Sequence, residues 1–462
     1  MEILFITHKY PPTIGGMEKQ SYELINGVAR EHKVHTLIYD NRMSRARFIL
    51  TLPMKVRKVL RENPNISLIH MNDGLMAFVG LIIKRITDVP VLATIHGLDI
   101  VFPSKIFQRV VLEKFKRLDG VIAVSQATAQ ECIKRGIDRD KVYVVRNGVD
   151  TDMSLINRQA GFRKVLEKKI GVPLQDKKIL VSIGRSVRRK GFSWFMTKVV
   201  PHLDKNIIFM IVGPSDPNIR RIQFMLNLLP RRVAHLIVLM LGLGMDEIDI
   251  HRALRKPEIA GRAFYLGKQP YEDMVQILKH ADMFVMPNIK VEGDAEGFGL
   301  VALEASVNGT PVLASAMEGI TCAVIDGRNG FLVPPEKESA WIEKIHNLLS
   351  DLPYLKQFGE GAKNFTITNY AWKKMVDGYI KVFNKYHCRH AWDRSHAAET
   401  VGATGTAAPE LPRVVCLVEA HGACDLKSQL RPLPAPEEGA EVDLNVGSGV
   451  DRGDCLRPGR HP

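Results

Sequence analysis

Residues 286–306 read MPNIKVEGDAEGFGLVALEAS and are the most informative part of the chain. A short apolar run of strand type, residues 281–287, precedes them, and residues 300–307 (LVALEASV) are good helix formers with little to interrupt a helix. We therefore predict a strand, a glycine-containing loop and a helix that begins near Phe298 or Gly299. The free N–H groups and the positive dipole end of such a helix suit a phosphate or sugar oxygen.

Two glutamates flank this loop, with Glu296 before it and Glu304 about two helical turns further on. Both carboxylates can serve one elongated, hydroxyl-rich ligand whose phosphates contact the intervening backbone, and a nucleotide sugar has this form. On this interpretation the donor-binding backbone comprises Gly297, Phe298, Gly299 and Leu300. The alternative is an acidic helix cap and a solvated face. Taken alone, the two glutamates give both interpretations about equal weight.

The sequence on either side of the glutamates decides between the two interpretations. The strand ends at Pro287, Glu-Gly-Phe-Gly follows at 296–299, and Gly-Thr-Pro-Val at 309–312 starts another strand. This order closely resembles the donor-site signature of the retaining glycosyltransferases of the glycogen-synthase-like family 4. The resemblance extends over residues 1–388. It implies the GT-B fold, an α/β fold in which two Rossmann-like domains with parallel sheets face each other across a cleft.

The resemblance and the composition together predict four segments. Residues 1–170 form an acceptor-side Rossmann-like domain, and residues 171–365 form a nucleotide-sugar-binding one. A helix at 366–388 crosses back to the first domain. Residues 389–462 are rich in Ala, Gly, Pro and Arg without sustained periodicity, which predicts a disordered C-terminal tail.

The charge and cysteine content limit the class of protein and its location. The 462 residues suit two α/β domains, and the net charge of +14 attracts anions such as nucleotide diphosphates, anionic lipid or nucleic acid. We expect no nucleic-acid partner, because zinc-finger spacing, an RNP-like strand and a basic helix arm are all missing. The six cysteines contain no CxxC, the N-terminus does not resemble a signal peptide, and no run reaches the ~20 apolar residues of a membrane span. We therefore expect a cytoplasmic protein, with peripheral membrane contact left open.

The first half of the chain contributes further candidates on loops that follow strands. Gly15 and Gly16 lie between a strand at 3–6 and a helix, and the resemblance implies that they face the donor diphosphate; alone, the pair is more typical of a turn. The strand at 91–94 brings His96 to a carboxyl end, where open α/β sheets bind ligands. A lone histidine is more often structural, but the family places one here beside the transferred sugar. Asn147, in an Asn-Gly-Val-Asp turn, is a further candidate for donor binding.

The second half opens with residues 178–192, KILVSIGRSVRRKGF, in which Arg185 and Lys190 follow a strand. Two cations five residues apart can bind a diphosphate from two sides, the arginine through a planar fork and the lysine as a point charge. The alternative is an ordinary basic loop. Both residues match the diphosphate clamp of the resembling family. We assign no role to Arg188 and Arg189.

Three further stretches have local interpretations. Residues 42–61 predict a basic helix with apolar residues between its charges, suited equally to an anionic surface and to a solvated face. Residues 225–244 are an apolar run that Pro-Arg-Arg at 230–232 interrupts. This run either forms a helical hairpin packed on its own domain or docks on a membrane with its arginines at the headgroups. Asn-Gly at 329–330 predicts a tight hairpin.

The resemblance implies a metal-independent retaining glycosyltransferase without a cofactor. Its donor would be a UDP- or GDP-linked sugar, its acceptor a glycan or a lipid-linked molecule, and its setting polysaccharide or lipopolysaccharide synthesis. Charge separation during transfer favours Arg185 and Lys190 as the groups that neutralise the diphosphate. The resemblance implies that Glu296 holds the sugar hydroxyls, Glu304 binds the ribose, and His96 lines the sugar pocket. Two alternatives stay open, a GT-B sugar-nucleotide epimerase and a non-catalytic nucleotide-sugar-binding protein.

Overall fold

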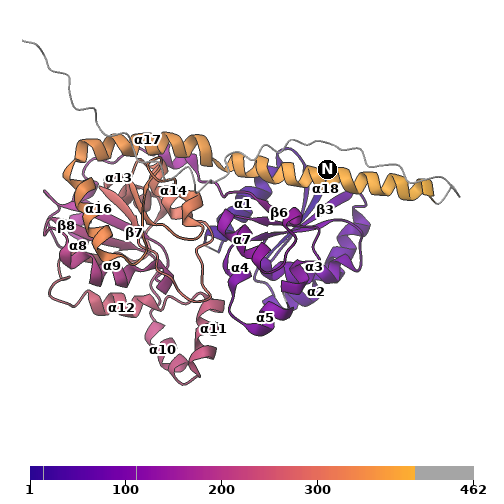
Figure 1. The fold of residues 1–462 in the computed structure, drawn as a ribbon, viewed down its shortest axis with the longest axis horizontal. Helices are drawn as coiled ribbons and strands as arrows, with labels where there is room; N and C mark the ends of the chain where they lie inside the picture. The colour runs from indigo at the N-terminus through magenta and orange to yellow at the C-terminus, as the bar shows by residue number, and fades with distance from the viewer. Residues whose placement is uncertain (14, 111, 401–462) are drawn as a thin grey trace, which may run out of the picture. The chain divides into compact units, whose positions relative to one another are not determined.

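Two parallel six-stranded sheets organise the chain in this computed structural model, which describes residues 1–13, 15–110 and 112–400 (Figure 1). The sheet of the N-terminal half has the order β2-β1-β3-β4-β5-β6 and that of the C-terminal half the order β12-β11-β10-β7-β8-β9. The first comprises β1 (Glu2–Thr7), β2 (Lys33–Ile38), β3 (Ile66–Met71), β4 (Val91–Ile95), β5 (Gly120–Ala123) and β6 (Val142–Val144). The second comprises β7 (Lys178–Ile183), β8 (Ile207–Val212), β9 (Ala263–Tyr265), β10 (Met283–Met286), β11 (Val312–Ser315) and β12 (Phe331–Val333). The prediction of an α/β fold with two parallel sheets is confirmed.

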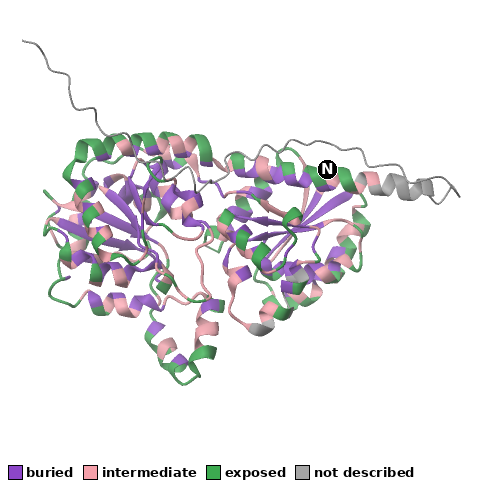
Figure 2. Cartoon of the chain, viewed as in Figure 1, coloured by how far each residue is buried: buried purple, intermediate pink, exposed green. Residues whose placement is uncertain are grey.

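The central strands are continuous apolar runs because helices cover both faces of each sheet. The β8 sequence IIFMIV is buried at every position, as is ISLIHM of β3. Figure 2 shows the same burial along the strands of both sheets. A strand with one face in water would instead alternate apolar and polar residues.

Helices connect the strands and form the outer layers. In the N-terminal half these are α1 (Gly16–Ala29), α2 (Arg45–Glu62), α3 (Gly74–Lys84), α4 (Leu98–Val101), α5 (Lys105–Val110), α6 (Leu112–Phe115) and α7 (Gln126–Lys134). In the C-terminal half they are α8 (Phe162–Ile170), α9 (Phe192–Lys198), α10 (Ile219–Asn227), α11 (Arg231–Leu241), α12 (Asp246–Ala253), α13 (Tyr271–His280), α14 (Leu300–Val307), α15 (Ile320–Ala323), α16 (Glu338–Ser350) and α17 (Leu352–Tyr370). None of the described helices is both long and apolar enough to cross a bilayer.

The last described helix, α18 (Trp372–Thr400), packs on the N-terminal half. Tyr379 is buried there, and its hydroxyl accepts a hydrogen bond from Gln20 Nε2 at 3.1 Å. A Cβ at Gly27 of α1 would come within 2.4 Å of Val376, so glycine lets the two helices approach closely. The helix runs to Thr400 and so includes residues 389–400 of the segment predicted as a tail. The predicted tail beyond them lies outside the described residues, and the predicted domain boundaries stay predictions.

The predicted hairpin at 329–330 is wrong. Strand β12 pairs with β11 in parallel, whereas a hairpin requires antiparallel strands. The turn itself exists and joins α15 to β12. Asn329 stabilises it, because its Oδ1 accepts from Ile325 N at 2.7 Å and its Nδ2 donates to Ala323 O at 2.8 Å. The Asn-Gly signal identified a turn, but the crossover through α15 sets the direction of the strand.

Candidate active site

Three adjacent strands of the C-terminal sheet bring the candidate residues together at their carboxyl ends. The order β11-β10-β7 places the loop after β10, which contains Glu296, between the loop after β7, which contains Lys190, and the loop after β11, which contains Glu318. Ligands of open parallel sheets bind at this edge. Residues more than a hundred positions apart therefore meet at one site.

Glu296 is the centre of a charged network. Its Oε2 accepts from Lys190 Nζ at 2.7 Å and from Asn288 Nδ2 at 3.2 Å, and it also pairs with Arg189 Nη1. The backbone N–H of Glu296 donates to Glu318 Oε2 at 2.6 Å. Burial alone would raise the pKa of Glu296, but the charges of Arg189 and Lys190 lower it to about 2. The carboxylate is therefore ionised at neutral pH and only accepts hydrogen bonds.

Arg189 also belongs to this network, although the sequence alone indicates no role for it. Its Nε donates to Asp294 Oδ1 at 3.1 Å while Nη1 pairs with Glu296, so one guanidinium bridges two carboxylates of the loop after β10. The Arg189 side chain is 15% exposed, whereas Arg188 is exposed and forms no salt bridge with the described residues. The sequence offered no signal that separates the two neighbouring arginines. Both arginines lie in the 3₁₀ turn at Arg188–Lys190, and only Arg189 contacts the loop after β10.

Arg185 lies in the same loop as Lys190 and faces a third segment. Its Nη1 donates to Gly242 O at 3.2 Å, at the C-terminal end of α11. A guanidinium has five N–H groups, so Arg185 keeps donors for a ligand. The role of Arg185 and Lys190 as a diphosphate clamp stays a prediction, since the structure contains no ligand.

Two glycines allow the main chain of the N-terminal half to touch the Glu296 loop. A Cβ at Gly297 would lie 1.9 Å from His96 O, and a Cβ at Gly97, whose φ is +112°, would lie 3.0 Å from Gly297 Cα. Any side chain at either position would separate the two loops. The close contact of Gly97 with Gly297 therefore brings the neighbouring residues His96 and Glu296 into the same site.

The imidazole of His96 is held by the main chain. Its Nε2 lies 3.0 Å from Asn72 O, and because a carbonyl only accepts, Nε2 carries the proton of this bond. The neutral ring then has Nδ1 as an acceptor. Asp99 Oδ2 accepts from His96 N at 2.9 Å and fixes the adjoining backbone.

The N-terminal ends of α1 and α14 lie close together. The side chain of Leu300 would be 3.0 Å from a Cβ at Gly16, and Glu304 Oε1 is 3.4 Å from Lys19 Nζ. Helix α14 begins at Leu300, just after the predicted start, with Gly299 before it at φ +95°. Two helix N-termini therefore converge where the resemblance expects the diphosphate.

Three predicted donor-binding residues have other surroundings. The ring of Phe298 is buried in a cluster that includes Val124 and Leu303, so only its backbone is free to contact a donor. Gly15 has φ 170°, an extended conformation open to any residue. Asn147 is buried, and its Oδ1 has no hydrogen-bond partner among the described residues. Their roles in donor binding stay predictions.

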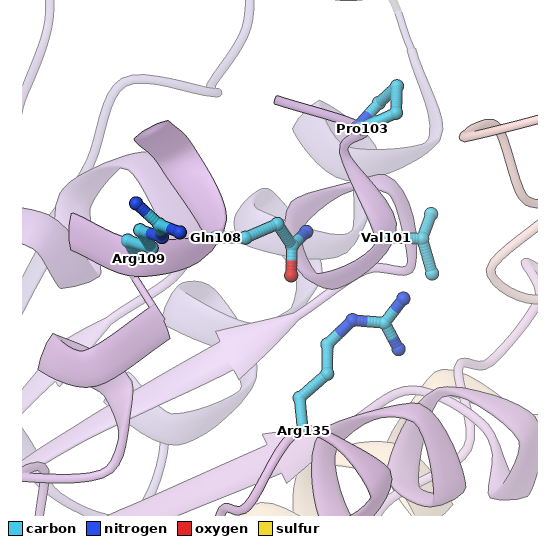
Figure 3. A pocket seen from close by; sticks show the side chains of 5 residues that line it. All are labelled: Val101, Pro103, Gln108, Arg109 and Arg135. Carbon is cyan, nitrogen blue, oxygen red and sulfur yellow. The ribbon is translucent and has the colours of Figure 1, made fainter. Parts of the chain in front are cut away.

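Two hollows adjoin the site. A cavity of about 400 Å³, the size of a small-ligand pocket, is lined by Gly97, Ile100, Thr128, Asp294, Glu296 and Glu318. A second hollow of about 440 Å³ is lined by Val101, Pro103, Gln108, Arg109 and Arg135, and Figure 3 shows Arg135 extending toward Val101. Within the described residues no three His, Cys, Asp or Glu side chains form a group that could hold a metal ion. Metal independence stays a prediction.

Solved structures share this arrangement of two parallel sheets, the GT-B fold. Sucrose-phosphate synthase from Thermosynechococcus elongatus superposes with a TM-score of 0.65 at 21% identity, covering 84% of this chain and 99% of that one. Anabaena HepE in complex with UDP-glucose gives a TM-score of 0.65 at 17% identity, covering 83% of this chain and all of that one. The predicted GT-B fold is confirmed.

Family models then identify the class of enzyme. "Glycosyltransferase Family 4" matches residues 14–153 and "Glycosyl transferases group 1" matches residues 164–365. The chain belongs to the family-4 glycosyltransferases, as its donor-site signature predicts. Relatives include the D-inositol 3-phosphate glycosyltransferase of Corynebacterium glutamicum, 27% identical over 70% of this chain and 73% of the relative. The alpha-maltose-1-phosphate synthase of Mycolicibacterium smegmatis is 23% identical over 83% of this chain and 99% of the relative.

Proposed function

We propose that this glycosyltransferase moves a sugar, with retention of configuration and without a metal, from a UDP- or GDP-linked donor to a hydroxyl of a glycan or lipid-linked acceptor. The observation that supports this most is the ion pair between Glu296 and Lys190. Gly297, next to Glu296, packs against the main chain of His96 and so keeps this pair beside the histidine. One site then combines a cation for phosphate with an ionised carboxylate for sugar hydroxyls. The solved structure of HepE, which has the same fold, is a complex with UDP-glucose, so UDP is the first nucleotide to test.

The charges in the site match those that develop during transfer. As the glycosyl–phosphate bond breaks, positive charge grows on the sugar carbon and negative charge on the leaving diphosphate. Arg185, Lys190 and the N–H groups at the starts of α1 and α14 stabilise the diphosphate. The acceptor oxygen bonds to the same face of the sugar carbon, and its proton passes to the leaving phosphate oxygen. The reaction balances without a separate protein base.

Glu296 and His96 position the donor sugar in this scheme. The ionised Glu296 accepts hydrogen bonds from sugar hydroxyls, and Lys190, with three N–H groups, serves Glu296 and the diphosphate together. Glu304, about one turn after the start of α14, binds the ribose. The cavity of about 400 Å³ beside Gly97 and Glu296 takes the sugar.

The acceptor lies on the side of the N-terminal half. We favour an acceptor used in polysaccharide or lipopolysaccharide synthesis at the cytoplasmic membrane face, because the chain is strongly basic. A phosphorylated small molecule is the second candidate, since Arg109 and Arg135 line the hollow in Figure 3 and two relatives are named for phosphorylated compounds.

A thermal-shift screen followed by product analysis tests the function. A ligand that binds only the folded chain raises its melting temperature, so the matching nucleotide among UDP, GDP and ADP should do so, and Lys190→Ala should abolish the shift. Nuclear magnetic resonance of the product then gives the anomeric configuration. Sugar conversion without any acceptor would support the epimerase, and binding without turnover would support the non-catalytic nucleotide-sugar-binding protein. Inversion at the sugar carbon would contradict the retaining mechanism.

A further inference from the structure

Helices α10 and α11 form a hairpin that is only half covered. They lie between β8 and β9 and project from the C-terminal half in Figure 1. Their inner faces pack together in a small cluster around Ile219, Leu226 and Met245. The sequence left open whether this stretch packs on its own domain or docks on a membrane. The inner face packs, and the outer face remains exposed (Figure 2).

The outer face of the hairpin is apolar at its far end. Phe224 and Met225 are each 67% exposed and Leu228 is 73% exposed, and their spacing puts all three on one side of α10. We call Phe224, Met225 and Leu228 the apolar hairpin face. Large side chains gathered in this way on a soluble domain mark a contact surface.

Basic residues surround the apolar hairpin face, and acidic residues are excluded from it. Residues 217–245 contain the four arginines Arg220, Arg221, Arg231 and Arg232 but no Asp or Glu. All four are exposed, and none forms a salt bridge within the described part of the chain. Arg220 and Arg221 lie one turn before Phe224 and Met225 on the same side of α10. An apolar tip ringed by unpaired arginines complements an anionic lipid surface.

We propose that the α10–α11 hairpin docks on an anionic lipid bilayer, with the apolar hairpin face at the acyl boundary and the four arginines at the lipid phosphates. Helix α11 of the hairpin contacts the candidate active site: Gly242 O, just after its C-terminal end, accepts from Arg185, and His235 Nε2 donates to Glu292 O at 2.9 Å in the Glu296 loop. Docking therefore holds the donor loops beside the membrane. Its use in transfer rests on the proposed function, whereas the binding itself does not.

Vesicle cosedimentation of the full chain tests the docking. We expect about tenfold tighter binding to equimolar phosphatidylcholine–phosphatidylglycerol vesicles than to pure phosphatidylcholine vesicles, with the difference lost at high salt. The variant F224S/M225S/L228S should weaken binding about tenfold, because it removes the inserted side chains. Its melting temperature should stay unchanged, since all three side chains are exposed.

Two further double variants and a measurement of oligomeric state complete the test. The pair L155S/V165S removes two exposed apolar side chains elsewhere, 75% and 53% exposed, and should not affect vesicle binding. If L50S/M54S on the basic helix α2 removes the binding and the hairpin variant does not, the proposal is wrong. A dimer in light scattering that the hairpin variant converts to a monomer would assign the face to a second copy and also overturn it. Nucleotide thermal shifts of the same variants test the proposed function separately.

Discussion

Lys190 Nζ lies 2.7 Å from Glu296 Oε2, so a cation expected to bind the donor phosphates and a carboxylate expected to bind the donor sugar hold each other in place. Arg189 adds a second positive charge to the same carboxylate and anchors it to Asp294. These side chains are largely buried, which strengthens their interactions and makes an unpaired member costly. The site is thus ordered before a donor arrives, as efficient charge stabilisation requires.

Replacing Glu296 by Gln should reduce the rate of sugar transfer about 100-fold, because a neutral amide neither accepts from sugar hydroxyls as strongly nor balances Lys190. Two cations would also lose their partner, so the melting temperature should fall. The rate of nucleotide release with saturating donor measures the first effect. Glu343→Gln, an exposed carboxylate on α16, is the matched control and should leave both quantities unchanged. Near-normal transfer by the Glu296 variant would refute the site assignment.

The two neighbouring arginines should behave differently. Arg189→Gln removes a largely buried guanidinium between two carboxylates and should lower the free energy of unfolding by about 3 kcal/mol. Arg188→Gln removes an exposed charge without a salt bridge and should change it by less than about 0.5 kcal/mol. Urea denaturation of both variants measures the difference. Equal effects of the two substitutions would show that the Arg189 bridge contributes nothing to stability.

This pair also shows where inference from the sequence ends. The apolar runs at 178–183 and 281–287 predict the strands. Lys190 and Glu296 are predicted as site residues because they lie in the loops that follow these strands, and position relative to a strand end can be read from the local sequence. Whether Arg188 or Arg189 turns inward is decided by a contact with a loop about a hundred residues away. No local pattern of charge records that choice.

The same reason explains the other differences. The sequence from residue 389 onward has no sustained periodicity and therefore predicts a tail, although residues 389–400 continue the helix α18. The turn at Asn329 was recognised, but strand direction depends on the crossover and not on the turn residues. The approach of Gly97 to Gly297 joins the two halves, and a glycine in the sequence does not reveal what lies against it.

Gly297→Ala should impair transfer without unfolding the chain. The new methyl group would lie 1.9 Å from His96 O, so the His96 loop and the Glu296 loop must move apart. We expect kcat to fall about tenfold or more, because a displacement of about 1 Å in a catalytic group can reduce the rate 100-fold. Gly361→Ala, where a Cβ meets nothing within 4 Å, is the control and should retain full activity. An unchanged kcat in Gly297→Ala would mean that this contact is not required.

Asp246 should make the stability of the chain depend on pH. Burial raises its pKa to about 6, against 3.8 for the unfolded chain, although Ser193 donates to it through both N and Oγ. The folded chain thus holds this proton more tightly than the unfolded chain, so protonation stabilises the fold. That stabilisation is complete below pH 4 and is lost as the pH rises through 6, amounting to about 3 kcal/mol.

The effect matters to the site because Asp246 N donates to Ser186 O, in the loop between Arg185 and Lys190, at 2.9 Å. Asp246→Asn cannot ionise and keeps an oxygen for Ser193, so its free energy of unfolding should fall less than that of the wild type between pH 4 and 7. Asp88→Asn, at an exposed carboxylate in the N-terminal half of the chain, should follow the wild-type curve in this range. Urea denaturation at a series of pH values measures all three. Parallel curves for the wild type and Asp246→Asn would show that Asp246 titrates normally and that its burial does not favour the protonated form.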